Sequence, residues 1–257
     1  MSPVGRRARY PVLAASTPTL PHDRLRPLID EHLGRGAPTG WFEPAYRAAV
    51  DAGARLPWQE AAPHPWVASW LDAPVLTPPG PRALVVGCGT GQEAELLAAR
   101  GYAVVGIDVA PTALAWAAAR LRRASKRIRR AVAYREADLL TLDPGALGPF
   151  DLVVEVHTVP WLPGLVQDAA MAAIGPLVRA GGVALTITTL RAAEDDAPVG
   201  PPWPQAPSAL ASYRAGGLVR LALEHPPGGA PGPVEVRLTW QRPRTGPVED
   251  RAVSPGA

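Results

Sequence analysis

A short apolar run that opens into three closely spaced glycines constrains the fold of this chain most. Residues 82–87 read Arg-Ala-Leu-Val-Val-Gly and predict a buried strand. The glycines are Gly87, Gly89 and Gly91, and residues 91–100 then carry apolar side chains at helical spacing, with a glycine just beyond them. Glycine lets the backbone turn sharply and lets a ligand approach closely. A strand, a glycine loop and a helix in this order predict a ligand-binding unit.

Further strands and helices alternate along the chain. We predict strands at 103–108, 131–136, 150–156 and 183–188, and helices at 111–123 and 162–179. This alternation indicates βαβ units and a parallel sheet. After a helix at 207–215, two strands at 218–224 and 234–242 are joined by a Pro/Gly loop, which predicts an antiparallel pair. The expected fold class is α/β, a doubly wound, seven-stranded, mostly parallel sheet with one antiparallel strand.

The two ends of the chain differ from its middle in composition. Residues 1–40 are rich in Pro, Arg and Gly, and we expect a poorly ordered N-terminal extension there, apart from a short amphipathic helix at 25–33. Residues 41–242 are the expected folded domain, and residues 243–257 are an expected disordered tail. The domain begins with an aromatic segment, in which we predict two helices, 41–52 and 65–72, that cover a site.

The composition limits the class of protein. Hydrophobic residues make up 47% of the 257 residues, which is enough for a sizeable core. No apolar run reaches the roughly 20 residues of a membrane span, and the apolar stretch after the first arginines is too short for a signal peptide. We therefore expect a cytoplasmic protein without a membrane partner. Cys88 is the only cysteine, which excludes an internal disulfide and a cysteine metal cage, and we expect no metal.

An acid ends the second predicted strand. A carboxylate at the position of Asp108 can accept hydrogen bonds from both ribose hydroxyls of a nucleotide. The dinucleotide fingerprint G-x-G-x-x-G would require glycine at position 92, which is Gln92. The spacing here is G-x-G-x-G instead, and it resembles motif I of the class I S-adenosylmethionine-dependent methyltransferases.

The resemblance continues along the sheet. Asp138, which follows the third predicted strand, matches the acid that contacts the adenine amino group in this family, and the segment FDLVVE at 150–155 is similar to the motif beside the transferred methyl group. The resemblance implies an S-adenosylmethionine-dependent methyltransferase with S-adenosyl-L-methionine as its cofactor. The residues that it implies for the donor site are Gly87, Cys88, Gly89, Thr90, Gly91, Asp108, Val109, Ala137, Asp138, Leu139, Glu155, Tyr46 and Trp58.

Two segments are similar to one branch of that family, the thiopurine and halide/thiol methyltransferases. They are residues 84–114 and residues 41–71, and the second contains WFEPAY, LPWQ and HPWVASWL. In that branch an aromatic N-terminal segment covers the donor. The acid–Arg pair of thiopurine members is replaced here by Glu155 and Val156, and the N-P-P-Y motif of exocyclic-amine methylation is absent. We expect a small-molecule acceptor with an S, O or N nucleophile, and we slightly favour a thiol.

His157 is the candidate general base, because it lies just past Glu155 at the expected position of the methyl group. Methyl transfer is an in-line displacement, so an enzyme needs mainly to align the reactants and exclude water, with a base where the acceptor carries a proton. Glu155 is expected to orient His157 or to contact the donor, and for both residues a structural role is an equal alternative. The rings of Trp58, Trp66, Trp161 and Trp203 are candidates for the acceptor pocket or for stacking on the sulfonium.

Two other classes of function stay open. One is a nicotinamide-dependent oxidoreductase, which Gln92 disfavours because it replaces the third glycine of the dinucleotide fingerprint. The other is a non-catalytic methyltransferase-like protein that binds the donor or RNA without turnover. The basic run from Arg120 to Arg130 suits RNA, but it is more typical of the solvated end of a helix. We therefore expect no nucleic-acid partner, and we expect a monomer or a homodimer.

Overall fold

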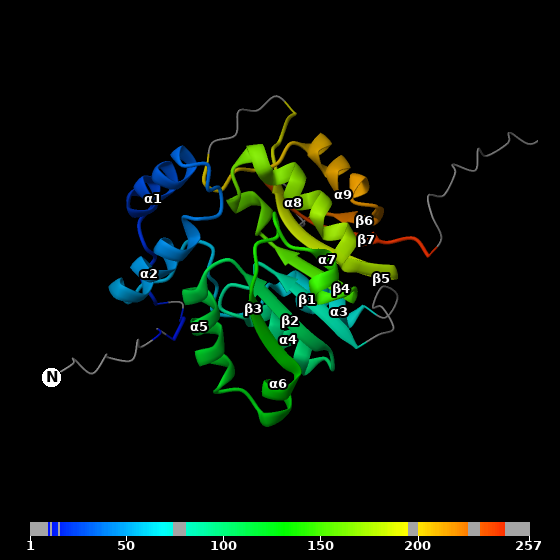
Figure 1. Cartoon of the computed structure of the whole chain (residues 1–257), viewed down its shortest axis with the longest axis horizontal. Helices are drawn as coiled ribbons and strands as arrows, with labels where there is room; N and C mark the ends of the chain where they lie inside the picture. The colour runs from blue at the N-terminus through cyan, green and yellow to red at the C-terminus, as the bar shows by residue number, and fades with distance from the viewer. Residues whose placement is uncertain are drawn as a thin grey trace, which may run out of the picture.

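A seven-stranded sheet with helices on both faces forms the body of the protein (Figure 1). The computed structural model describes residues 10, 12–14, 16–73, 81–194, 200–225 and 232–244. The strands are β1 (Arg82–Val86), β2 (Ala103–Asp108), β3 (Val132–Glu136), β4 (Phe150–Val156), β5 (Val178–Leu190), β6 (Val219–Glu224) and β7 (Val234–Gln241).

The strand order is β3-β2-β1-β4-β5-β7-β6. The first five strands pair in parallel, and β7 pairs antiparallel with both β5 and β6. The predicted fold class, with its single antiparallel strand, is confirmed. Strands β1 to β3 are added toward one edge of the sheet, and β4 and β5 toward the other, so the strand order switches between β1 and β4. Ligands of such sheets bind at this point, outside the carboxyl ends of the strands. The glycine loop follows β1 there.

Helices cover the two faces of the sheet in separate groups. One face carries α3 (Pro65–Asp72), α4 (Gln92–Ala99) and α5 (Pro111–Leu121), and the other carries α7 (Pro144–Leu147), α8 (Gly164–Leu177) and α9 (Ala211–Ala215) (Figure 1). Side chains of a strand alternate between faces, so Ala83 and Val85 pack toward the first group and Leu84 and Val86 toward the second. Because both faces are buried after the exposed Arg82, residues 83–86 of β1 are all apolar rather than alternating.

The N-terminal region contains the helix predicted at 25–33, and this helix is longer than predicted. Within the segment expected to be poorly ordered, the structure has a helix, α1 (His22–Gly34), in which Leu25 and Ile29 are buried. Its side chains join a hydrophobic cluster with Trp41 and with α2 (Phe42–Ala52). The helix itself is polar and contains a proline, so its order depends on these tertiary contacts. Residues 1–9, and those of the expected tail from 245 onward, lie outside the described residues.

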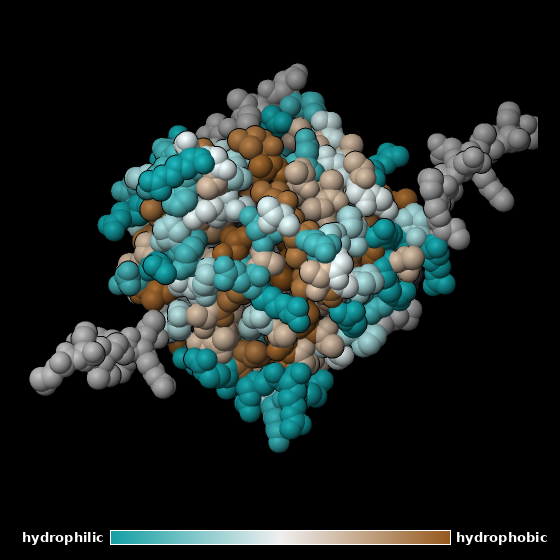
Figure 2. Space-filling view, in the orientation of Figure 1, coloured by the Kyte–Doolittle hydropathy of each residue, from teal (hydrophilic) through white to brown (hydrophobic). Residues whose placement is uncertain are grey.

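The basic run lies at one end of the molecule. Part of it forms α6 (Lys126–Ala131), which the sequence analysis did not predict, and Figure 2 shows hydrophilic side chains gathered over that end. The guanidinium groups of Arg127 and Arg129 donate to backbone carbonyls at 3.0 and 2.7 Å. These contacts agree with a solvated helix end. Within the described ranges, no helix is long and apolar enough to cross a membrane.

Candidate active site

An open cavity lies at the carboxyl ends of the parallel strands, and its space together with its mouth to solvent is about 1140 Å³. It is bounded by the loops after β1, β2, β3 and β4, and by the N-terminal segment between α1 and α3, which we call the cover (residues 35–64). The predicted donor residues that line it are Gly87, Cys88, Gly89, Thr90, Asp108, Val109, Ala137, Asp138, Leu139, Tyr46 and Trp58. Most of the residues predicted for the donor site therefore lie together at one cavity.

The glycine loop is packed from both sides. Gly87, Gly89 and Gly91 all have positive φ angles, of 59°, 50° and 89°. A Cβ atom on Gly87 would overlap the side chain of Thr158, and one on Gly91 would overlap the ring of Tyr134. Gly91 does not line the cavity, in contrast to its predicted role. It is glycine because a neighbouring ring and the left-handed backbone leave no room for a side chain.

Asp108 ties the glycine loop to β2. Its carboxylate accepts a hydrogen bond from the backbone N–H of Gly89 at 2.8 Å and another from that of Ala110 at 2.9 Å. Burial raises the pKa of Asp108 to about 6, and these backbone hydrogen bonds oppose the rise. The carboxylate faces the cavity, so a ligand with hydroxyl donors would meet an acceptor whose position is already fixed.

Asp138 connects the sheet to the cover. Its Oδ1 accepts the backbone N–H of Leu140 at 2.9 Å, and its Oδ2 accepts the hydroxyl of Thr39 at 2.7 Å. A second attachment joins α2 to α5, where Glu43 accepts both the backbone N–H and the hydroxyl of Thr112, at 2.9 and 2.8 Å. The cover is therefore held by polar contacts as well as by apolar packing.

Aromatic rings form one wall of the cavity. Tyr46 and Trp58 line it as predicted, and the indole N–H of Trp58 donates to the hydroxyl of Tyr46 at 3.1 Å. Trp161 also lines it, with its ring centroid 4.6 Å from that of Trp58. The other two candidate rings lie elsewhere. Trp66, on α3, packs against the guanidinium group of Arg237 on β7. The backbone N–H of Trp203 donates to the carbonyl of Pro160 at 2.6 Å, and neither ring lines this cavity.

Glu155 lies behind the cavity rather than in it. It is fully buried in β4, and its Oε1 accepts the backbone N–H groups of Thr158 and Val159 at 2.6 and 3.0 Å. Burial raises the pKa of Glu155 to about 7. The sequence analysis left three roles open for Glu155: a contact with the donor, an orienting contact with His157, and a structural role. The contacts in the structure are those of the structural role, because its carboxylate holds the backbone amides of the turn after β4.

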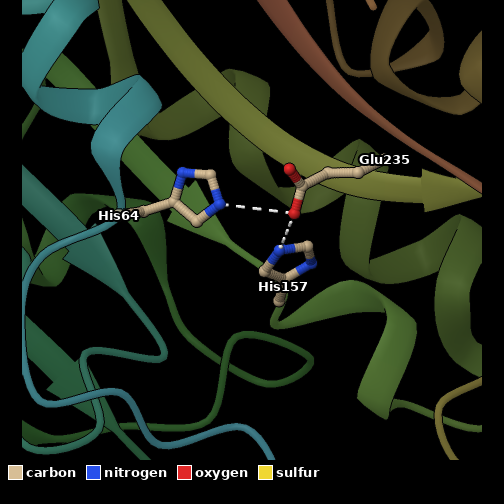
Figure 3. Close-up of side chains that lie close together, drawn as sticks. All are labelled: His64, His157 and Glu235. Atoms are coloured by element: carbon tan, nitrogen blue, oxygen red, sulfur yellow. Dashed lines mark hydrogen bonds and ion pairs between the residues drawn. The ribbon is translucent and has the colours of Figure 1, made fainter. Parts of the chain in front are cut away.

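His157 occupies that turn and faces the cavity. Its φ angle of 55° is unusual for a residue with a side chain, and its backbone N–H donates to Ile187 at 2.8 Å. Its Nε2 lies 2.8 Å from Oε1 of Glu235, and Nε2 of His64 lies 3.3 Å from the same oxygen (Figure 3). These two contacts hold the pKa of Glu235 well below its ordinary value.

Three residues at the site were missed by the sequence analysis. His64 and Glu93 line the cavity, and Oε1 of Glu93 accepts the backbone N–H of His64 at 2.9 Å. Glu235 pairs with Thr189 at the carboxyl end of β5. A signal for Glu235 was present, because an acid at the start of an antiparallel strand lies at the edge where the parallel strands end. No local pattern marked His64, which the cover brings in.

Comparison with known proteins agrees with this geometry. Residues 84–184 match a methyltransferase domain family. No curated protein matches the sequence. A solved structure from work on the conversion of a disulfide bond into a thioacetal group during echinomycin biosynthesis has a TM-score of 0.61 and 23% identity, over 81% of this chain and 93% of that chain.

Two further solved structures share the fold at lower identity. The glycopeptide N-methyltransferase MtfA, complexed with S-adenosyl-L-methionine, has a TM-score of 0.54 and 15% identity, over 67% of this chain and 92% of that chain. Geranyl diphosphate C-methyltransferase from Streptomyces coelicolor A3(2) has a TM-score of 0.56 and 14% identity, over 69% and 77%. The match of residues 84–184 to a methyltransferase domain bears out the predicted enzyme class, and the solved structures share the predicted fold. The resemblance to the thiopurine and halide/thiol branch stays a prediction.

Proposed function

We propose that this methyltransferase transfers the methyl group of S-adenosylmethionine to a small-molecule acceptor with a sulfur, oxygen or nitrogen nucleophile. The observation that carries the proposal is the placement of Asp108 and Asp138. Asp108 ends β2 and Asp138 follows the neighbouring strand β3, so both carboxylates line one cavity on the same side of the glycine loop after β1. A nucleoside needs such a pair, with one acceptor for its ribose and one for its base.

The cavity fits the donor in chemistry as well as in place. Asp108 would accept the ribose hydroxyls, Asp138 would accept the adenine amino group, and the loop from Gly87 to Gly91 would follow the ribose and methionine part. The rings of Tyr46 and Trp58 offer π faces to a cation. When bound, S-adenosylmethionine supplies a methyl group on a positively charged sulfur.

The residues of the chain contribute by aligning the acceptor with the methyl group and by excluding water. The cover closes the cavity with Tyr46, Trp58 and Thr39, and His157 stands beside the glycine loop as the proposed base. An acceptor thiol that is already ionised needs no base, whereas a hydroxyl or an amine does. The branch resemblance favours a thiol, and a structural neighbour linked to the conversion of a disulfide into a thioacetal also supports a sulfur acceptor.

Calorimetric titration with S-adenosylmethionine tests donor binding directly. We expect wild-type protein to bind it and Asp108→Ala to bind it more weakly by roughly 1–3 kcal/mol, the scale of hydrogen bonds to a charged group. Glu136→Ala is the matched control, because Glu136 pairs with Asp108 in the sheet but is exposed and does not line the cavity. Wild-type protein that fails to bind the donor would refute the proposal.

A screen with radiolabelled donor identifies the acceptor class. Thiols, halides, phenols and amines are incubated with the protein and labelled S-adenosylmethionine, and methylated products are counted. Donor binding without transfer to any of these classes would favour the non-catalytic alternative. Transfer to one class would name the nucleophile.

A further inference from the structure

Three side chains from distant parts of the chain meet at one edge of the cavity (Figure 3). His64 precedes α3 in the cover, His157 follows β4, and Glu235 lies near the start of β7. Their nitrogen and oxygen atoms all lie within 4.8 Å of one another. Two histidines and a carboxylate at this separation form either a metal site or a hydrogen-bonded network, and the two arrangements put protons in different places.

The surroundings of His64 decide between them. Its Nδ1 accepts the backbone N–H of Trp66 at 3.2 Å and so caps the N-terminus of α3. A neutral imidazole with an acceptor at Nδ1 carries its proton on Nε2, the atom that faces Glu235. A metal ion would need the lone pair of that Nε2, and the proton would then move to Nδ1, where it would face the N–H of Trp66. The geometry therefore favours hydrogen bonds over a metal.

The same reasoning fixes the proton of His157. An ionised Glu235 accepts hydrogen bonds and donates none, so Nε2 of neutral His157 carries the proton at 2.8 Å from Oε1. The lone pair of the ring is then on Nδ1, which has no hydrogen-bond partner among the described residues. His157 lines the cavity, and the next residue, Thr158, touches Gly87 of the glycine loop. Its turn is anchored by Glu155.

On the basis of the proposed function, we propose that Glu235 is a positioning residue that keeps Nδ1 of His157 free as the base for an acceptor whose attacking atom carries a proton. Nδ1 takes that proton, and the electron pair of the acceptor atom forms the bond to the methyl carbon. The carbon–sulfur bond breaks, and its electron pair stays on sulfur. The imidazolium that results lies against the Glu235 carboxylate. The acceptor is then a hydroxyl, an amine or a neutral thiol, not a halide.

Nitrogen-15 NMR of the histidine rings tests the proton placement without any acceptor. In the full chain above pH 8, we expect the wild-type spectrum to show His157 with a protonated Nε2 and a bare Nδ1. Glu235→Gln should give a mixture of both tautomers, because an amide can also donate to Nε2. Glu224→Gln is the control, since Glu224 is another strand carboxylate, paired with Arg237 and away from the cavity. A His157 tautomer unchanged by Glu235→Gln would overturn the inference.

Kinetics with the acceptor found in the screen supplies a second readout. We expect Glu235→Gln to lower kcat by roughly 10- to 100-fold, a part of the 10²–10⁴-fold contribution of a positioned base. Its pH profile should also shift, while donor affinity by calorimetry stays within about 2-fold. An unchanged kcat and pH profile, or a halide as the acceptor, would contradict the inference even where donor binding upholds the proposed function. Conversely, a wild type that fails to bind the donor would refute the proposed function, and the NMR result would still decide the proton placement.

Titration with zinc chloride tests the metal alternative. We expect no binding at micromolar concentration in the wild type or in His64→Asn, a variant that keeps a capping side chain on α3 but loses the Nε2 donor. Micromolar zinc binding that disappears in both His64→Asn and Glu235→Gln would overturn the inference in favour of a metal centre.

Discussion

Gly87 stands where two turns meet. Its positive φ angle closes the loop after β1, and the space of its missing side chain is filled by Thr158 from the turn after β4. The glycine loop and the turn that carries His157 therefore meet at Gly87, beside the hydrogen bond from the Thr158 hydroxyl to the carbonyl of Val86. A change here affects both the backbone conformation and the distance between the two halves of the site.

Gly87→Ala should weaken donor binding and stability together. The new methyl group overlaps Thr158, and the backbone of a non-glycine residue is strained at this φ angle, which costs about 1–3 kcal/mol. We expect a lower melting temperature and a larger Kd for S-adenosylmethionine. Gly34→Ala is the control, because nothing lies within 4 Å of a Cβ atom there. Equal donor affinity in the wild type and Gly87→Ala would contradict this account of the loop.

At the scale of elements, the central strands β1, β2, β4 and β5 were predictable because they are buried on both faces for most of their length and are therefore apolar runs. The donor loop and Asp108 follow from the same pattern, because they sit at strand ends. The start of β5 was not predictable, since Val178 pairs with Phe150 beside an irregular register, and the strand begins before the glycines that suggested its start. α6 was missed because its arginines hide any apolar period.

The roles of individual site residues were less predictable than the elements. Glu155 lies at the expected end of β4, but the direction of its carboxylate depends on the turn that follows. Glu235 and His64 come to the site through the antiparallel pairing of β7 and through the packing of the cover. Such contacts join residues far apart in the chain, so no local pattern carries them.

The order of α1 rests on a few buried apolar side chains. Leu25 is fully buried in the cluster with Trp41, so Leu25→Ala should lower the free energy of unfolding by about 2–5 kcal/mol. Leu165→Ala is the control, because Leu165 is 81% exposed. Urea unfolding followed by tryptophan fluorescence measures both. If the two variants unfold alike, α1 is not part of the cooperative fold.

At the scale of the whole molecule, buried carboxyls link stability to pH. The pKa of Glu155 rises on folding from its ordinary 4.5 to about 7, and that of Asp108 from 3.8 to about 6. Between these values the folded state holds protons that the unfolded state has released. The contribution of each group is therefore complete below its unfolded pKa and is lost as the pH rises through the folded pKa.

Glu155→Gln should remove much of this pH dependence. The amide oxygen can still accept the two turn N–H groups, but it has no charge to bury. We expect the wild type to lose on the order of 3 kcal/mol more stability than Glu155→Gln between pH 4.5 and 8. Melting temperatures across that range measure the difference, with Glu136→Gln as an exposed control. Parallel curves for the wild type and Glu155→Gln would mean that another group dominates.

The hydrogen bond from Thr39 to Asp138 links the cover to the proposed donor site. One carboxylate both fastens the cover and is proposed to meet the adenine. Such a coupling is reciprocal. If a bound nucleoside changes the stability of the Thr39–Asp138 contact by a given free energy, the contact changes the binding free energy of the nucleoside by the same amount. A donor that engages Asp138 is therefore expected to change how firmly the segment between α1 and α2, which carries Thr39, is held to the sheet.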